Sequence, residues 1–239
     1  MRKVLRTPKG YTGRVLRDIG RKIGAIPEGP LRTRIEERMA LVTRLLRQTA
    51  KGPRKIYALH EPEVDCISKG KARIRYEFGT KVSVATTPAG GFVVGMRSVP
   101  GNPHDGHTLA DALQQVETLT DQRPGLAVVD RGYRGHGVAG TTVLVGGTRR
   151  GLTPRLARLL RRRSAIEPEI GHMKTDGRLA RCTPLKGTLG DALFAVLCGC
   201  GHNIRKILAH LRALLAALLA GLIQAHAGQD RHLIPCPRA

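Results

Sequence analysis

Cysteines and long apolar runs are scarce in this chain of 239 residues. The five cysteines are an odd number in a chain too large to need a disulfide framework, so we expect reduced thiols. No apolar run reaches the roughly 18 residues that span a bilayer, and residues 214–223, which come nearest, are too short. The basic N-terminus lacks the apolar segment of a secretory signal. We therefore expect a cytoplasmic protein with no membrane partner.

Acidic residues are also few. The chain has only 18 Asp and Glu but 41 Lys and Arg, which gives a formal charge of +23 and a sequence pI near 11.1. Such an excess indicates an acidic partner, and nucleic acid is the leading expectation. Apolar residues make up 41%, which excludes wholesale disorder and leaves one or two globular domains. Residues 1–55 hold sixteen Lys and Arg against four acids and form either a phosphate-tracking arm or a solvated helical face.

Apolar periodicity predicts helices and strands in an α/β order. Helices are expected over 12–24, 30–49, 107–121 and 188–223, the last broken near 199–201. A strand over 73–85 is expected to turn at 88–91 and to return over 92–97 as a β-hairpin, and apolar runs predict strands over 126–130 and 142–145. Residues 51–70 are expected to form a connector, and the last fifteen residues to be frayed.

The segment RSAIEPEIGHMK spaces Arg163, Glu167 and Lys174 as R-x3-E-x6-K. Residues seven apart on a helix lie about two turns apart on one face, so a carboxylate and an ammonium would be neighbours. Upstream, the apolar run of VVDRGYRGH ends at Asp130, and a glycine-rich, basic turn follows. Thirty-six residues, 131 to 166, separate Asp130 from Glu167.

These segments, with YALHEPEV at 57–64, YEFGTKVS at 76–83 and PGNPHDGHTL at 100–109, resemble the DDE transposases of bacterial insertion sequences. The group resembled is called insertion-sequence-five, whose signature is Y-x2-R-x3-E-x6-K, and the similarity runs over about residues 14–210. The resemblance implies an RNase H-like core and metal-dependent cleavage and transfer of DNA strands. It implies Mg²⁺ or Mn²⁺ in a two-ion site, double-stranded DNA (transposon ends and target) as partner, and a bacterial, nucleoid-associated location. A homodimer stays open.

By resemblance, Asp130 and Glu167 are the second and third catalytic acids and the metal ligands. Arg163 and Lys174 would hold a phosphate, because guanidinium and ammonium groups suit phosphate recognition, and Arg131 and Arg134 are further candidates for DNA contact. Asp105 and Asp65 are candidates for an additional acid, and a helix cap is the preferred alternative for Asp105.

The chain departs from the family pattern in two ways. Leu160 stands where the signature has tyrosine, and no acid occurs before Asp18 to match the family's first aspartate. We therefore expect an incomplete RNase H-like core that lacks its first strand, and a chain that alone neither cleaves nor joins DNA. Unpaired strand edges would lower its stability. The expected domains are a basic helical arm (1–55), the core (56–187), C-terminal helices packed on it (188–223) and a tail (224–239).

Simpler interpretations stand beside these. Ser164 and Glu167 fit a capping box, and Pro168 is expected either to start a helix or to kink it. Cys198, Cys200 and His202 form a C-x-C-x-H pattern, but zinc ligands are usually spaced more widely, so packing inside a helix is the better interpretation. For the whole chain, the alternative function is that of a basic nucleic-acid-binding protein without catalysis, in which the acids are structural.

Overall fold

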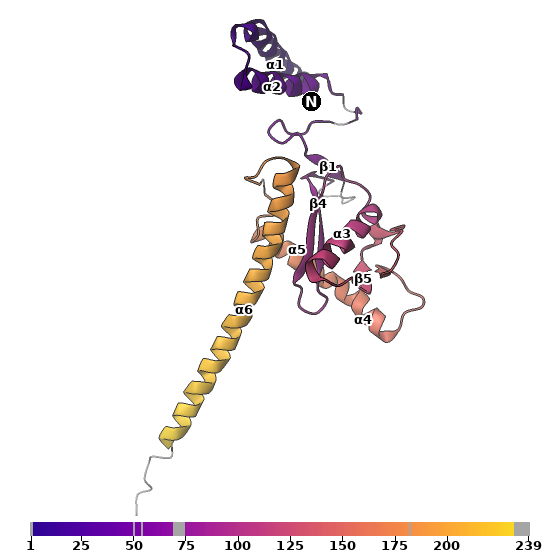
Figure 1. Ribbon diagram of the computed structural model, residues 1–239, viewed down its shortest axis with the longest axis vertical. Helices are drawn as coiled ribbons and strands as arrows, with labels where there is room; N and C mark the ends of the chain where they lie inside the picture. The colour runs from indigo at the N-terminus through magenta and orange to yellow at the C-terminus, as the bar shows by residue number, and fades with distance from the viewer. Residues whose placement is uncertain (1, 50, 54, 69–74, 182, 232–239) are drawn as a thin grey trace, which may run out of the picture. The chain divides into compact units, whose positions relative to one another are not determined.

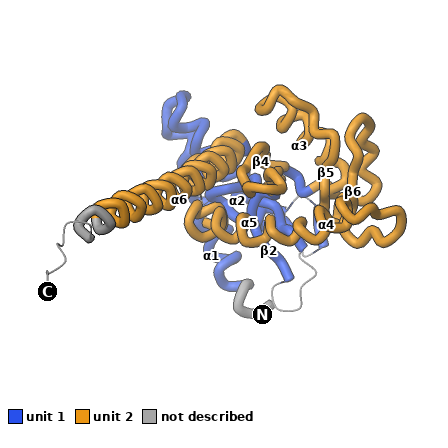
Figure 2. Tube along the Cα trace, turned by 90° about the horizontal axis from the view of Figure 1, so that it is seen from below, with its two compact units in different colours: residues 1–81, 100–102, 186–188 blue, residues 82–99, 103–185, 189–239 orange. Residues whose placement is uncertain are grey.

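The computed structural model describes residues 2–49, 51–53, 55–68, 75–181 and 183–231. The chain divides into two compact units (Figure 2). Unit 1 holds residues 1–81, 100–102 and 186–188, and unit 2 holds residues 82–99, 103–185 and 189–239. The described residues form a mixed helix and strand structure, as the sequence predicts.

Unit 1 begins with two helices, α1 (Arg2–Lys22) and α2 (Pro30–Arg47), separated by a short 3-10 turn, η1 (Ile23–Ala25) (Figure 1). Helix α2 confirms the prediction, and Pro30 begins it because the first helical position needs no amide hydrogen. Helix α1 starts ten residues earlier than predicted and includes Pro8. Among the described side chains of these two helices, none belongs to the buried apolar core.

Two short strands complete unit 1. Strand β1 (Asp65–Ser68) pairs antiparallel with β2 (Tyr76–Gly79) in the register Asp65 to Gly79. Strand β1 lies where the sequence analysis placed a connector, so that prediction is wrong there. The single strand predicted over 73–85 is also wrong, because it ends at Gly79, whose φ of +150° interrupts the extended backbone, and part of it, 73–74, lies outside the described residues.

The hairpin of β3 (Lys81–Thr86) and β4 (Val93–Val99) lies in unit 2 apart from Lys81, and it confirms the predicted pairing. Its turn is closed by a bond from Thr87 N to Phe92 O of 2.8 Å, and by Gly91 in the left-handed region at φ +64°. Helix α3 (Asp105–Thr120) then leads to β5 (Leu126–Val129) and the parallel β6 (Thr142–Val145). The described strands form three separate two-stranded sheets.

A helical run then carries the chain toward its last helix. It consists of α4 (Pro154–Arg162), a 3-10 turn η3 (Arg163–Ala165) and α5 (Ile166–Thr175). Pro168 does not start α5, which begins at Ile166, so the expectation that it is the first helical residue is wrong. It is the third residue of α5, where a missing amide hydrogen costs nothing because first-turn amides have no partner inside the helix. The Ser164 hydroxyl donates to Arg161 O rather than capping, so the capping-box interpretation is wrong.

Helix α6 (Gly187–Arg231) is continuous, so the predicted break near residues 199–201 is wrong. Gly199 instead permits close packing, because a Cβ there would lie 3.0 Å from Met96 Sδ and 3.1 Å from Val93. The core of unit 2 unites Met96 of β4, Met173 of α5, and Ala195 and Cys198 of α6. The first half of α6 is thus bound to the hairpin and to α5.

The second half of α6 is exposed to solvent. Leu214, Leu218 and Leu222 are 52%, 58% and 67% exposed. Residues Gly187–His226 include an 18-residue window of mean hydropathy 1.8, so by length and composition this helix could cross a membrane, and none of that window is buried. By this measure the expectation that no segment is long and apolar enough is wrong, because mean hydropathy stays high even where charged residues interrupt the apolar run.

Candidate functional site

Asp130 follows β5 directly and lies at the start of a 3-10 turn, η2 (Arg131–Tyr133). Its Oδ1 accepts a hydrogen bond of 2.7 Å from Arg131 N, so the carboxylate is fixed at the end of the strand. The side chain is 63% exposed. The apolar run of β5 therefore ends in an acid that remains open to solvent.

Glu167 lies in the first turn of α5, and its side chain is 68% exposed. Arg163, one helical turn earlier, contacts it with Nη2 at 3.3 Å from Oε1. The same guanidinium places Nη1 3.7 Å from Asp130 Oδ1. Two carboxylates separated by thirty-six residues of sequence (131 to 166) therefore meet at one cation.

Two glycines after β6 make room for this arrangement. A Cβ at Gly147 would lie 2.7 Å from Arg131 Nε, and a Cβ at Gly146 would lie 3.6 Å from Asp130 Oδ1. Gly147 also has φ +87°, which favours glycine. The sequence analysis did not identify this pair, although two glycines directly after an apolar strand are a visible signal of close backbone approach.

The two further acids are located differently. Asp105 is the first residue of α3, and the N-cap is His104, whose Nδ1 accepts from Gly106 N, so the expectation that Asp105 caps the helix is wrong. Its Oδ2 lies against Gly132, where a Cβ would be 2.5 Å away, so Asp105 lies beside the turn that follows Asp130. Asp65, in unit 1, accepts a hydrogen bond of 2.7 Å from Gly101 N.

The candidate phosphate-binding residues are accessible. Arg131, Arg134 and Lys174 are exposed, and within the described part of the chain the Lys174 ammonium has no carboxylate partner. Helix α4 adds exposed cations at the following positions: Arg155, Arg158, Arg161 and Arg162. Lys174 is on the helix that carries Glu167, and Arg131 and Arg134 follow Asp130.

Carboxylate oxygens are the ligands that Mg²⁺ prefers, so Asp130 and Glu167 suit a divalent ion by chemistry. Their number is small: among the described residues, no group of three or more His, Cys, Asp or Glu side chains is arranged to hold a metal ion. The Arg163 guanidinium already contacts both carboxylates. The residues therefore fit one weakly held ion better than a two-ion site.

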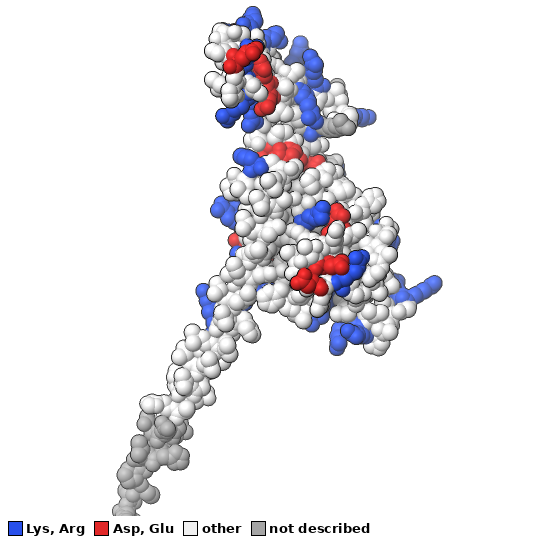
Figure 3. Space-filling view, in the orientation of Figure 1, with Lys and Arg blue, Asp and Glu red and all other residues white. Residues whose placement is uncertain are grey.

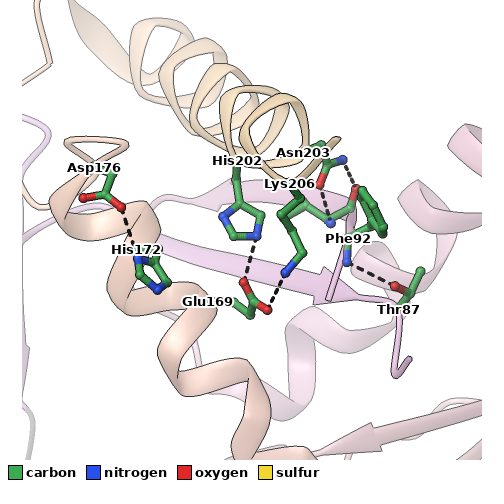
Figure 4. Close-up of polar contacts among 9 residues, drawn as sticks. Thr87, Phe92, Glu169, His172, Asp176, His202, Asn203 and Lys206 are labelled. Atoms are coloured by element: carbon green, nitrogen blue, oxygen red, sulfur yellow. Dashed lines mark hydrogen bonds and ion pairs between the residues drawn. The ribbon is translucent and has the colours of Figure 1, made fainter. Parts of the chain in front are cut away.

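A second polar cluster anchors α5 from its other side (Figure 4). Glu169 Oε1 lies 2.7 Å from Lys206 Nζ, and Glu169 Oε2 lies 3.0 Å from His202 Nε2. His202 is almost fully buried, with 3% of its surface exposed. The Glu169 carboxylate also lies directly against Gly91 in the hairpin turn, where a Cβ would clash.

Asn203 adds two hydrogen bonds to this anchorage. Its Oδ1 accepts from Val93 N and its Nδ2 donates to Val93 O, both at 2.8 Å. Together with Glu169, it joins α5, α6 and the hairpin of unit 2. The sequence analysis assigned no role to Glu169, Asn203 or Lys206, although residues 202 and 206 are spaced to share one face of a helix.

The C-x-C-x-H pattern is not a metal site in this structure. Cys198 is buried and donates through Sγ to Gly177 O, Cys200 is exposed, and His202 meets Glu169. Two residues along a helix turn the side chain by about 200°, so the two thiols face apart. This confirms packing as the role of Cys198, and burial raises the pKa of its thiol, an effect that Arg205 partly opposes.

At the end of α5, His172 Nδ1 lies 3.1 Å from Asp176 Oδ2. This hydrogen bond, followed by one from Thr175, holds the pKa of the Asp176 carboxyl below its ordinary value of 3.8. Asp176 is the C-cap residue of α5, two residues beyond Lys174.

Comparison with known proteins gives one match. Residues 55–142 match the family model described as "Transposase DDE domain", which is 88 of the 239 residues (55 through 142). No curated protein and no solved structure matches the chain. The matched region begins before β1 and ends at the first residue of β6, so it includes Asp105 and Asp130 and stops before Glu167. Residues 55–142 thus carry similarity to a transposase DDE domain, a domain of RNase H-like fold that acts on DNA.

Proposed function

We propose that this chain is a transposase of the insertion-sequence-five group that binds double-stranded DNA in the bacterial cytoplasm. In this proposal Asp130 and Glu167 are the acids of an RNase H-like site. One observation carries it: Arg163 contacts both acids at 3.7 and 3.3 Å, although they come from a strand end and a helix far apart in sequence. The family match over residues 55–142 supports it independently.

The residues divide into two roles. Asp130 and Glu167 would hold a divalent ion, which supplies charge stabilisation at the attacking and leaving oxygens of phosphoryl transfer when bound. Arg163 and Lys174, with Arg131 and Arg134, would hold the DNA phosphates near these acids, and the α4 arginines would extend the contact along the backbone. Exposure of these cations and the overall charge of +23 support this role.

We further propose that this chain by itself does not cleave or join DNA. A two-ion site needs acids on both ions, and the described residues offer two carboxylates bridged by an arginine and no cluster of three. Asp105 is the nearest candidate for a third acid, because it lies against Gly132 in the turn after Asp130.

Manganese titration of the full chain tests the acid site. Mn²⁺ binding, measured by calorimetry or by electron paramagnetic resonance, is expected to weaken at least about tenfold in Asp130→Asn and in Glu167→Gln, since each removes one of two charged ligands. Glu117→Gln is the matched control, because Glu117 of α3 is a surface acid that forms an ion pair with Arg123. Equal Mn²⁺ binding in all four proteins would refute the acid site.

DNA binding tests the basic site. Fluorescence anisotropy on a duplex is expected to show affinity that falls steeply with salt, and Arg158→Gln should lower the salt slope by about one, the loss of one phosphate contact. Arg123→Gln, which removes a cation already paired with Glu117, should leave the slope unchanged. The acid variants should keep their DNA affinity.

The second candidate function is a basic nucleic-acid-binding protein without catalysis. It is favoured by the absence of a three-acid cluster among the described residues. DNA binding alone does not separate the two functions, because both predict counterion release. A site that binds Mn²⁺ through Asp130 and Glu167 is expected only for the transposase.

A further inference from the structure

The second half of α6 exposes a continuous apolar surface. Ten large aliphatic side chains between residues 204 and 223 are exposed, namely Ile204, Ile207, Leu208, Leu211, Leu214, Leu215, Leu218, Leu219, Leu222 and Ile223. Arg205, Lys206 and Arg212 lie along the first part of this stretch, and residues 213–226 carry no acidic or basic side chain, as the white part of the helix in Figure 3 shows. Apolar surfaces of this extent on proteins mark interaction sites, because leaving them in water is unfavourable.

These side chains are not distributed evenly around the helix. At 3.6 residues per turn, all ten fall on about one half of the circumference, and Arg212 lies near one edge of that half. The opposite half holds small or polar residues, which include Lys206, Ala209, His210, Ala213 and Ala220. A helix with bulky residues on one side and alanine on the other is suited to packing against another helix. Arg205, Lys206 and Arg212 leave only residues 213–226 of this region uncharged, which is shorter than the roughly 18 to 20 residues that span a bilayer.

The spacing along the stripe is that of a coiled-coil seam. Ile204, Leu208, Leu211, Leu215, Leu218 and Leu222 follow one another at intervals of four, three, four, three and four residues. Such a repeat averages 3.5 residues and keeps the same seam against a partner helix over its length. Residues 204–223 would present it over about 30 Å.

We propose that this apolar face of α6, residues 204–223, pairs two copies of this chain into a dimer. A seam with heptad spacing is complementary to itself, so the same surface serves both copies around a two-fold axis. Residues 213–226 contain no Lys, Arg, Asp or Glu, so the copies meet there without bringing like charges together, in spite of the net charge of +23. This inference does not depend on the acid site.

Sedimentation equilibrium of the full chain at physiological ionic strength tests the proposal. The expected mass is twice the 25.9 kDa of one chain. The variant Leu211→Lys with Leu218→Lys is expected to be monomeric, with a dissociation constant raised at least about 100-fold, because two central seam positions become charged. The matched control, Ala213→Lys with Ala220→Lys, adds the same charge on the opposite half and should remain dimeric.

Four results would overturn the proposal: a monomeric native chain, a seam variant that stays dimeric, a control variant that dissociates, or insertion of the native chain into lipid vesicles. Circular dichroism checks that α6 stays helical. If the lysine seam variant loses helix, Leu211→Ala with Leu218→Ala replaces it, with weaker dimerisation as the expected result.

Flotation with phosphatidylcholine vesicles, which are neutral, gives the remaining test. The dimer should stay in solution, and partition of the native chain into the vesicles that resists high salt and alkaline carbonate would overturn the proposal in favour of a membrane helix.

Discussion

Glu167 and Glu169 are two residues apart on α5 and serve opposite sides of that helix. Glu167 is exposed and meets Arg163 at 3.3 Å, while Glu169 is mostly covered and meets Lys206 at 2.7 Å and His202 at 3.0 Å. Side chains two positions apart on an α-helix point about 200° apart around its axis, so one acid is exposed and the other is covered. The inner acid therefore fixes the helix that presents the outer one.

Glu169→Gln is expected to destabilise the fold by about 1–3 kcal/mol, because it leaves Lys206 and the buried His202 without their carboxylate partner. Urea unfolding followed by circular dichroism measures this. Glu117→Gln, an exposed acid in a surface pair, should change stability by less than about 0.5 kcal/mol. Equal stability of the two variants would mean that the cluster does not anchor α5.

Gly91→Ala is expected to cost more than its backbone conformation alone explains. Gly91 has φ +64°, which costs a residue with a Cβ about 1–2 kcal/mol, and the added Cβ would also meet the Glu169 carboxylate. Gly101→Ala is the control, since Gly101 has φ +79° and open space around its Cβ position. The difference between the two free energies of unfolding isolates the clash. No difference would argue against close packing of Glu169 on the hairpin turn.

Arg163→Gln is expected to strengthen Mn²⁺ binding about tenfold, because it removes a positive charge within 4 Å of both acids. Calorimetric titration compares it with Arg162→Gln, whose side chain donates to Ala89 O and contacts neither acid. The second variant should bind Mn²⁺ as the native chain does. Weaker binding in Arg163→Gln would show that the guanidinium arranges the carboxylates for the ion instead of competing with it.

The hydrogen bond from His172 predicts a titration of Asp176 below pH 3.8. Because the folded-state pKa is depressed, the contribution of this group to stability is complete above its ordinary pKa and is lost as the pH falls through the folded value. Carboxyl carbon NMR measures the midpoint. In His172→Gln the midpoint should move up toward 3.8, and an unchanged midpoint would assign the shift to Thr175.

Cys200 is expected to react with a thiol reagent at neutral pH at least about ten times faster than Cys198, because the thiolate is the reactive form and Cys198 is buried with a raised pKa. Peptide mass spectrometry after brief alkylation separates the two residues. Cys198 should become reactive on unfolding or as the pH rises above its ordinary pKa of 9.0. Rapid labelling of Cys198 in the folded chain at neutral pH would contradict its burial.

Local patterns determined many of the elements. Apolar periodicity predicted α2, the β3–β4 pairing, α3, β5 and β6, since each of these carries a strong period and clear glycine or proline boundaries. Spacing and resemblance also selected Asp130, Arg163 and Glu167, which the structure brings together. Their roles in metal and DNA binding remain predictions.

Only the tertiary structure decided the features that depend on distant neighbours. Gly199 packs on Met96 and Val93 instead of breaking α6, because the space that a glycine leaves is filled by another element, which no local pattern specifies. Glu169 is tied to Lys206 and Gly91 for the same reason: three segments far apart in sequence had to converge. The sequence by itself determined which residues have the chemistry of the site, and packing determined which of them meet.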